Sequence, residues 1–223
     1  STALYPTMAQ LVAENDSVRL KSLLVKTIYI VSLIIIPISI ACILFAKDIV
    51  SIVFQRGAFD SHSVYYTAIV FSSYAIGMLF TGMEDIFSNV FYCYGDTKTT
   101  MRISLVTITL NIILNIIFVR IFGIAGIALA SSIAAIIGTS SLFVLLKRHV
   151  SISLAELWLE LVKITLVAIV ACGFALLCVN IFDLKQVILK MIVACVTGIV
   201  FYTFGLIITR SEAIKILLLH VRR

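Results

Sequence analysis

Six long apolar segments without charged residues are the feature of this sequence that most constrains its fold. Each is long enough to cross the roughly 30 Å hydrocarbon core of a bilayer as a helix. Because backbone polar groups in lipid must be paired within the segment, and because the alternating pattern of a barrel strand is absent, each segment is predicted to be helical. The expected spans are 27–46, 64–83, 103–119, 121–146, 164–182 and 191–209.

The composition supports a membrane protein rather than a soluble enzyme. Hydrophobic residues make up 62% of the chain and charged residues 13%, whereas soluble domains are nearer half apolar and a quarter charged. We therefore expect an all-α, polytopic transmembrane bundle. No nucleophile elbow or phosphate-binding loop occurs, and the histidines lie in predicted loops or the tail, so no enzyme is expected. The cysteines form no C-x-x-C pair and are predicted to be free thiols.

The net charge of +6 is best explained by membrane topology. The charges flank the apolar segments instead of clustering on one soluble face, so no nucleic-acid partner is expected. Lys and Arg are more numerous before residue 27, at 98–102, at 147–163 and after 209 than on the opposite side. The positive-inside rule then places both ends of the chain in the cytoplasm.

The chain divides into two predicted parts. Residues 1–148 form a cytoplasmic lead-in and four spans. Residues 149–223 form an interfacial helix at 154–161, two final spans and an amphipathic cytoplasmic tail. The sequence begins without an initiator Met or a signal-peptide pattern, so it is expected to be the C-terminal part of a longer protein.

A polar stripe on segment 103–119 is the first candidate site. Asn111 and Asn115 lie one helical turn apart, and a tight turn near Gly123 makes the next span an antiparallel neighbour that brings Ser131 close to them. Interhelical hydrogen bonding is the favoured explanation, at about 1 kcal/mol or less per contact. A cation site built from side-chain oxygens is the alternative.

Three further features of the spans carry expectations. Glu84 and Asp85 extend the second span, and they face either a polar cavity or the membrane interface. Pro37 should bend the first span unless a neighbour satisfies the carbonyl that it frees. Small residues at four-residue spacing form a ridge on which another helix can pack closely: Gly126, Ala130, Ala134 and Gly138.

The segment after the first span is predicted to form a short helix at 49–54 that ends in a turn. Arg56 is expected to complement the end of this helix, and Gly57 to adopt a left-handed conformation. Asp60 or Ser61 is expected to cap the following helix.

Several motifs resemble the MurJ/MviN family of lipid II flippases. They are Phe54-Gln-Arg-Gly-Ala-Phe-Asp60, with Phe54, Arg56, Gly57, Phe59 and Asp60 as its marked positions; Phe91-Tyr92, followed by Asp96-Thr-Lys98-Thr; and the segment that opens at Gly123. The resemblance extends from Ser1 to about Arg148, and the last two spans match by position and hydropathy. At two positions the chain departs from the family: Thr100 replaces a usual proline, and Asp85 stands where a basic residue is common.

The resemblance implies a fold and a function. The family has fourteen helices in two lobes plus a final pair, so this chain would be the later part of the second lobe followed by that pair. The family carries the undecaprenyl-pyrophosphate-linked peptidoglycan precursor across the membrane by alternating access. The implied partners are this precursor, membrane lipids and the N-terminal helices of the same transporter. No cofactor is implied except sodium, at positions that match Asn111, Asn115 and Ser131.

Two alternatives stay open. The chain is also compatible with an exporter of another lipid-linked oligosaccharide or of a drug from the same superfamily. A non-transporting membrane scaffold descended from a flippase is the second alternative.

Overall fold

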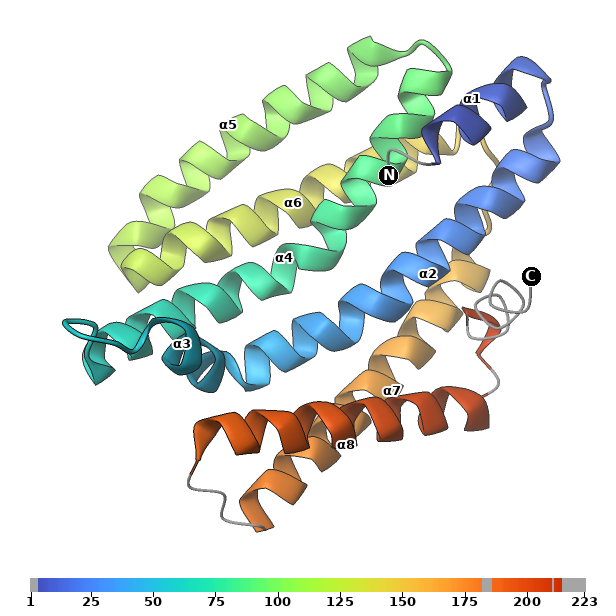
Figure 1. The fold of residues 1–223 in the computed structure, drawn as a ribbon. Coiled ribbons are helices and arrows are strands. Elements are labelled where there is room, and N and C mark those ends of the chain that lie inside the picture. Colours follow the sequence, from blue (N-terminus) through green and yellow to red (C-terminus); the bar gives the residue numbers. More distant parts are fainter. Residues whose placement is uncertain (1–3, 182–185, 210, 214–223) are drawn as a thin grey trace.

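The computed structural model describes residues 4–181, 186–209 and 211–213, and these residues form helices joined by short turns, with no strand among them (Figure 1). The predicted all-α class is confirmed. The helices are α1 (Tyr5–Ala13), α2 (Ser17–Leu44), α3 (Ala46–Phe54), α4 (Ser61–Cys93), α5 (Thr97–Phe122), α6 (Ile124–Leu146), α7 (Leu154–Ile181) and α8 (Val187–Ile208).

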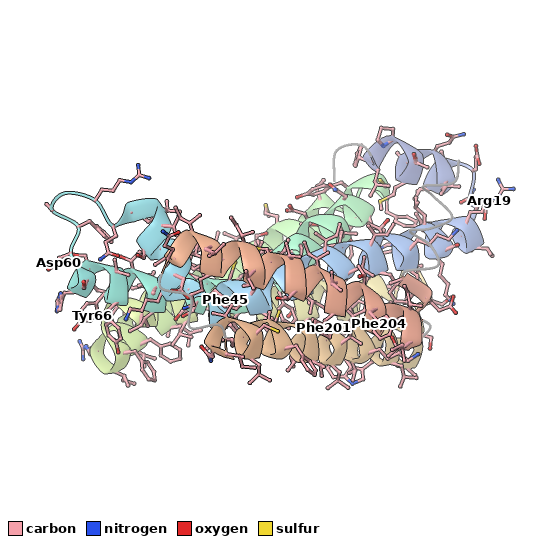
Figure 2. The ribbon with its side chains drawn as sticks, turned by 60° about the horizontal axis from the view of Figure 1, so that its bottom comes forward. Arg19, Phe45, Asp60, Tyr66, Phe201 and Phe204 are labelled. Atoms are coloured by element: carbon pink, nitrogen blue, oxygen red, sulfur yellow. The ribbon has the colours of Figure 1, made fainter. Side chains whose placement is uncertain are left out.

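Six helices of the described chain are long and apolar enough to cross a membrane, namely α2, α4, α5, α6, α7 and α8. Most begin earlier or end later than the apolar segments alone predicted, because capping residues rather than hydropathy set the helix ends. Asp16 accepts a hydrogen bond of 2.9 Å from the Arg19 N–H and so starts α2 well before residue 27. Asp60 and Arg19 lie at opposite ends of the bundle (Figure 2), hereafter the Asp60 end and the Arg19 end.

Helix α6 is the centre of the four-helix part, since it packs against both α4 and α5. The predicted ridge of small residues makes these approaches close. A side chain at Gly138 would meet the Thr107 hydroxyl at 2.5 Å, and Ala130 and Ala134 are buried. On α4, a Cβ at Gly77 would lie 2.8 Å from Ser132 of α6. The ridge is therefore a packing surface, as predicted.

Helices α7 and α8 form a pair that joins the rest of the chain mainly through α2 (Figure 1). Among the described spans, α5 is the least buried. No residue in the most apolar 18-residue window of α5 is buried, against 39% for both α6 and α7. The reason is that α5 packs chiefly on α6 alone, whereas α7 lies between α2 and α8.

The predicted interfacial segment 154–161 and the following span form one continuous helix, α7. A buried stripe runs through both parts without a break, at Leu157, Ile164, Ala168, Ala171 and Ala175, so the packing surface continues from one part into the other. An interfacial position for the first turns of α7 stays a prediction. The predicted amphipathic tail, 214–221, lies outside the described residues.

Pro37 lies inside α2, which is continuous from Ser17 to Leu44. Proline has no N–H to donate to the carbonyl of Leu33. The hydroxyl of Tyr202 on α8 donates to that carbonyl instead, at 2.8 Å. At the Asp60 end, the Lys190 ammonium lies 2.7 Å from Asp48 of α3. Helix α8 therefore contacts α2 through Tyr202 and α3 through Lys190.

Candidate functional site

The two asparagines and Ser131 form a chain of hydrogen bonds between α5 and α6. The Asn115 amide donates to Asn111 Oδ1 at 2.8 Å, and the Asn111 amide donates to Ser131 Oγ at 3.1 Å. Ser131 donates to the carbonyl of Ile127 one turn earlier. Gly123, with φ +61°, makes the tight turn between the two helices. The predicted approach of Ser131 to the asparagine pair is confirmed.

The arrangement fits interhelical packing directly and a cation only in part. The oxygens of Asn111 and Ser131 already accept hydrogen bonds from amides, whereas Asn115 Oδ1 is buried and has no partner among the described residues. A hard cation needs about six oxygen ligands. Asn111, Asn115 and Ser131 supply three side-chain oxygens at most, so a cation here would need further ligands beyond these three residues.

Glu84 and Asp85 differ in their surroundings although they are adjacent on α4. Glu84 is half-buried, and Asp85 is exposed and lines a groove between α2 and α4. Neither carboxylate makes a hydrogen bond or ion pair within the part of the chain that the structure describes. Two residues further, Phe87 packs on Phe143 of α6 at 5.5 Å, so α4 still contacts α6 beyond the two acids. A polar cavity or the membrane interface as the surroundings of the two acids stays a prediction.

The segment Phe54–Asp60 is a turn at the Asp60 end. Helix α3 ends at Phe54, and Gly57 has φ +58°, a conformation that favours glycine. Asp60 accepts a hydrogen bond of 2.8 Å from the Ser63 N–H and caps α4. Hydrogen bonds from Ser63 also lower the pKa of Asp60. Phe54 and Phe59 pack across the turn with ring centroids 6.0 Å apart, and Arg56 is exposed.

Asp96 is the corresponding cap at the Arg19 end. Its carboxylate accepts hydrogen bonds from the Thr99 hydroxyl at 2.7 Å and the Thr99 N–H at 3.2 Å. These bonds, and then the nearby His149 and Arg102, lower the pKa of Asp96. His149 lies 4.0 Å from Asp96 and stacks on Tyr94. Lys98 is exposed on the first turn of α5.

Thr100 is buried, and its hydroxyl has no partner among the described groups. This is the position where the resembled family usually has proline. A buried unpaired hydroxyl is unfavourable, so the departure leaves a local energetic defect at the start of α5.

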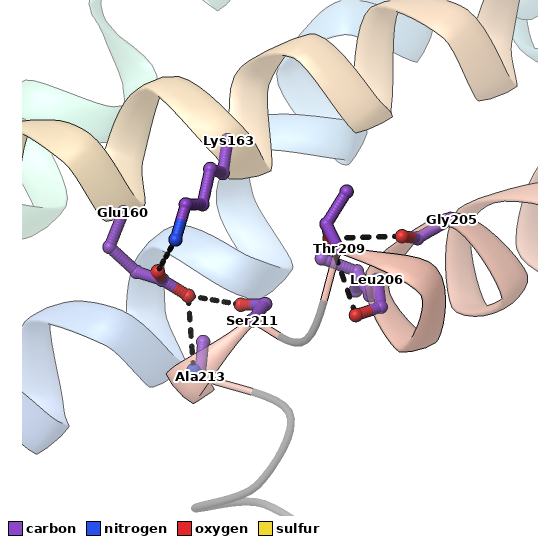
Figure 3. Close-up of polar contacts among 7 residues, drawn as sticks. All are labelled: Glu160, Lys163, Gly205, Leu206, Thr209, Ser211 and Ala213. Carbon is purple, nitrogen blue, oxygen red and sulfur yellow. Dashed lines mark hydrogen bonds and ion pairs between the residues drawn. The ribbon is translucent and has the colours of Figure 1, made fainter.

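Sequence reasoning did not find the role of Glu160, which is buried near the start of α7. Its carboxylate accepts hydrogen bonds from the Ser211 hydroxyl and the Ala213 N–H, and it lies 3.5 Å from the Lys163 ammonium (Figure 3). The start of α7 is thereby tied to the segment after α8. Glu160 lies within the predicted interfacial helix 154–161 and is 51 residues from Ser211, so no local pattern indicated this contact.

Comparison with known proteins identifies the family. A family profile described as "Lipid II flippase MurJ" matches residues 1–198 of the chain. The chain belongs to the MurJ family. The match continues past Arg148, where the motifs end, and reaches into α8. With six long apolar helices among its described residues, this MurJ family member is a multi-pass membrane protein.

Individual relatives give the same result. A probable lipid II flippase MurJ from Borreliella burgdorferi is 30% identical over 177 residues, which is 78% of this chain and 35% of that protein. A lipid II flippase MurJ from Burkholderia cenocepacia is 27% identical over 183 residues, 82% of this chain and 36% of that protein. The chain therefore spans about a third of the length of these relatives.

A solved structure shares the fold. The lipid II flippase MurJ in its inward closed conformation matches with a TM-score of 0.72 and 22% identity, over 91% of this chain and 42% of that one. At this identity the likeness shows the helix arrangement alone.

Proposed function

We propose that this chain is the C-terminal part of a lipid II flippase, which translocates the undecaprenyl-pyrophosphate-linked peptidoglycan precursor across the bacterial inner membrane. The observation that carries the proposal is the family match over residues 1–198. The transporter works by alternating access, in which two lobes rock around a central cavity, as in other repeat-built transporters. It moves its substrate without chemical conversion and so serves cell-wall synthesis as a carrier.

The surface of the bundle supports a part that works within a larger transporter. Helix α5 presents apolar side chains outward along most of its length, and a groove that contains the Asp85 carboxylate opens between α2 and α4. Lipid can cover the first surface, but a carboxylate is poorly suited to lipid. The N-terminal helices of the transporter are the partners that we expect, and the basic residues that meet the pyrophosphate belong to them.

The orientation follows from the positive-inside rule. Among the described residues, the Arg19 end has eight basic residues and the Asp60 end has four. The first set is Arg19, Lys21, Lys26, Lys98, Arg102, Lys147, Arg148 and Lys163, and the second is Lys47, Arg56, Arg120 and Lys190. We place the Arg19 end, and with it both chain ends, in the cytoplasm. Cysteine labelling from outside intact cells tests this: Arg56→Cys should react with a membrane-impermeant maleimide, and Lys98→Cys should react only after the membrane is opened.

Rescue of cells depleted of their lipid II flippase tests the function. This chain alone is compared with the same chain fused behind its native upstream helices. We expect rescue by the fused form only. Failure of both forms despite normal membrane insertion would favour another lipid-linked oligosaccharide, a drug or a scaffold role, and transport assays with those substrates would then separate the alternatives.

Sodium coupling at Asn111, Asn115 and Ser131 is a second proposal. The unpaired Asn115 Oδ1 favours it, and the remaining ligands must come from beyond these three residues. The double substitution Asn111→Ala with Asn115→Ala should abolish any sodium dependence of transport while protein abundance stays near normal. Loss of abundance instead would assign these residues to packing.

A further inference from the structure

A polar pocket at the Arg19 end brings together basic side chains from two segments that are far apart in the sequence. It measures about 420 Å³, and we call it the Lys21 pocket. Its lining residues are Ser17, Val18 and Lys21 at the start of α2, and Lys147, Arg148, His149 and Ser151 between α6 and α7. These described lining residues include no acid. One sign of charge gathered around a hollow is typical of a site for an anion.

Buried apolar residues hold both walls of the Lys21 pocket in place. On α2, Leu20 is fully buried next to Lys21. After α6, the buried Val150 and Ile152 lie on either side of the exposed Ser151. The three buried residues belong to one hydrophobic cluster, and three N–H groups after α6 donate to carbonyls of its last turn at 3.0 Å. The fold therefore fixes where the basic groups stand.

The acids near the Lys21 pocket do not neutralise it. Asp16 pairs with Arg19 at 3.2 Å, and Asp96 faces His149 at 4.0 Å. The other basic residues of the lining, two lysines and one arginine, form no ion pair with any residue that the structure describes. Like charges held close together repel one another, and an anion between them removes this repulsion. The arrangement therefore favours a negatively charged ligand.

The position of the pocket favours a phospholipid headgroup over a soluble anion. Trp158 is exposed on the second turn of α7, a few residues after the pocket, and Tyr92 is exposed near the end of α4 at the same end of the bundle. Exposed Trp and Tyr mark the headgroup level of a membrane. Val18 gives the pocket a largely exposed apolar edge. Basic pockets beside transmembrane helices suit anionic headgroups.

We propose that the Lys21 pocket binds the phosphate group of an anionic phospholipid. Arg148 can donate two parallel hydrogen bonds to phosphate oxygens, and Lys21 and Lys147 supply further charge. The hydroxyls of Ser17 and Ser151 can donate to the remaining oxygens. The bound lipid then links the start of α2 to the turn between α6 and α7. The inference rests on the membrane location of the chain and not on its proposed transport activity.

Lipid selectivity at the pocket tests the proposal in the full-length protein. A fluorescent amino acid replaces Val18, and the protein is placed in phosphatidylcholine nanodiscs that contain an equal share of nitroxide-labelled phosphatidylglycerol or nitroxide-labelled phosphatidylcholine. We expect phosphatidylglycerol to quench the fluorophore at least several-fold more effectively, because each basic side chain near an anionic lipid favours its binding roughly fivefold. Equal quenching by the two lipids would overturn the proposal.

A matched pair of double variants separates this site from general surface charge. Lys147→Gln with Arg148→Gln removes two basic groups of the pocket and should bring the preference for phosphatidylglycerol close to one. Lys98→Gln with Arg102→Gln removes the same charge from exposed positions at the same end, outside the pocket, and should keep most of the preference. An equal loss in both double variants would assign the preference to the surface as a whole and sink the proposal.

Two competitors identify the source of the phosphate. Inorganic phosphate, added at constant ionic strength, should leave quenching by phosphatidylglycerol unchanged, and undecaprenyl pyrophosphate should displace phosphatidylglycerol no better than its share of the lipid predicts. Displacement by inorganic phosphate would assign the pocket to a free anion, and preferential displacement by undecaprenyl pyrophosphate would assign it to the substrate. Either result contradicts the proposal. None of these measurements requires transport, so their failure leaves the proposed function standing.

Discussion

The hydroxyl of Tyr202 on α8 donates a hydrogen bond of 2.8 Å to the carbonyl oxygen of Leu33 on α2. This is the carbonyl that Pro37, four residues later, leaves without its helical donor. Tyr202 is half-buried, and its ring lines an apolar cavity of about 270 Å³ between α2, α7 and α8, together with Pro37. The last helix therefore completes the hydrogen bonding of the first span.

Tyr202→Phe should lower the unfolding free energy of the full-length protein by about 1 kcal/mol, because it leaves the Leu33 carbonyl without a donor. Thermal unfolding in detergent measures the change. Tyr66→Phe is the matched control. Because the Tyr66 ring is exposed at the Asp60 end, this substitution should change the unfolding free energy little. In a Pro37→Ala background, where the helical donor returns, Tyr202→Phe should be less destabilising. Equal losses of unfolding free energy in both backgrounds would show that Tyr202 does not act by replacing the helical donor that Pro37 removes.

Two adjacent threonines at the start of α5 should respond oppositely to the same substitution. Thr99→Val removes the hydroxyl that donates to Asp96 and should destabilise the protein by about 0.5–1.5 kcal/mol. Thr100→Val removes a buried hydroxyl without a partner and should be neutral or stabilising by up to about 1 kcal/mol. Thermal unfolding of the two variants side by side gives the comparison. Destabilisation by Thr100→Val as large as that by Thr99→Val would contradict it.

Glu160→Ala should release the segment after α8 from α7. The carboxylate holds Ser211 and the Ala213 N–H, and hydrogen bonds to a charged group are worth about 1.5–3 kcal/mol. Amide exchange at Ala213 should therefore accelerate roughly tenfold or more, measured by hydrogen–deuterium exchange. Lys163→Met is the control: the lysine is half exposed, so its loss should change exchange little. Unchanged exchange in Glu160→Ala would show that other contacts hold this segment.

The Asp96 cap should weaken in acid. Its pKa is lowered in the folded protein, first by the Thr99 hydroxyl. A carboxylate with a lowered folded pKa stabilises the protein above its unfolded pKa, near 3.8, and that stabilisation is lost as the pH falls through the folded value. The stability difference between wild type and Asp96→Asn should thus be fully present at about pH 5 and shrink below about pH 4. A difference that does not change down to pH 3 would rule out this role for the carboxylate.

Much of the candidate site follows from local rules. Asp60 and Asp96 cap helices because short acidic side chains accept hydrogen bonds from the first free N–H groups of a helix. Gly57 adopts a left-handed conformation in a turn, as expected. The contact of Asn111 with Ser131 follows from helical spacing and a tight turn. Each of these depends on residues close in sequence or on two consecutive helices.

The amino-acid sequence by itself determined the number of spans and the family, because apolar segment length and local motifs require no knowledge of packing. Only the tertiary structure decided which helix satisfies the Leu33 carbonyl, which segment Glu160 holds and which groove contains Asp85. The same packing leaves α5, with its polar stripe, more exposed than α7. Hydropathy is nearly uniform around these helices, so no apolar face indicates a neighbour. In such helices the contacts are chosen by shape, small residues and a few polar groups that meet across long sequence separations.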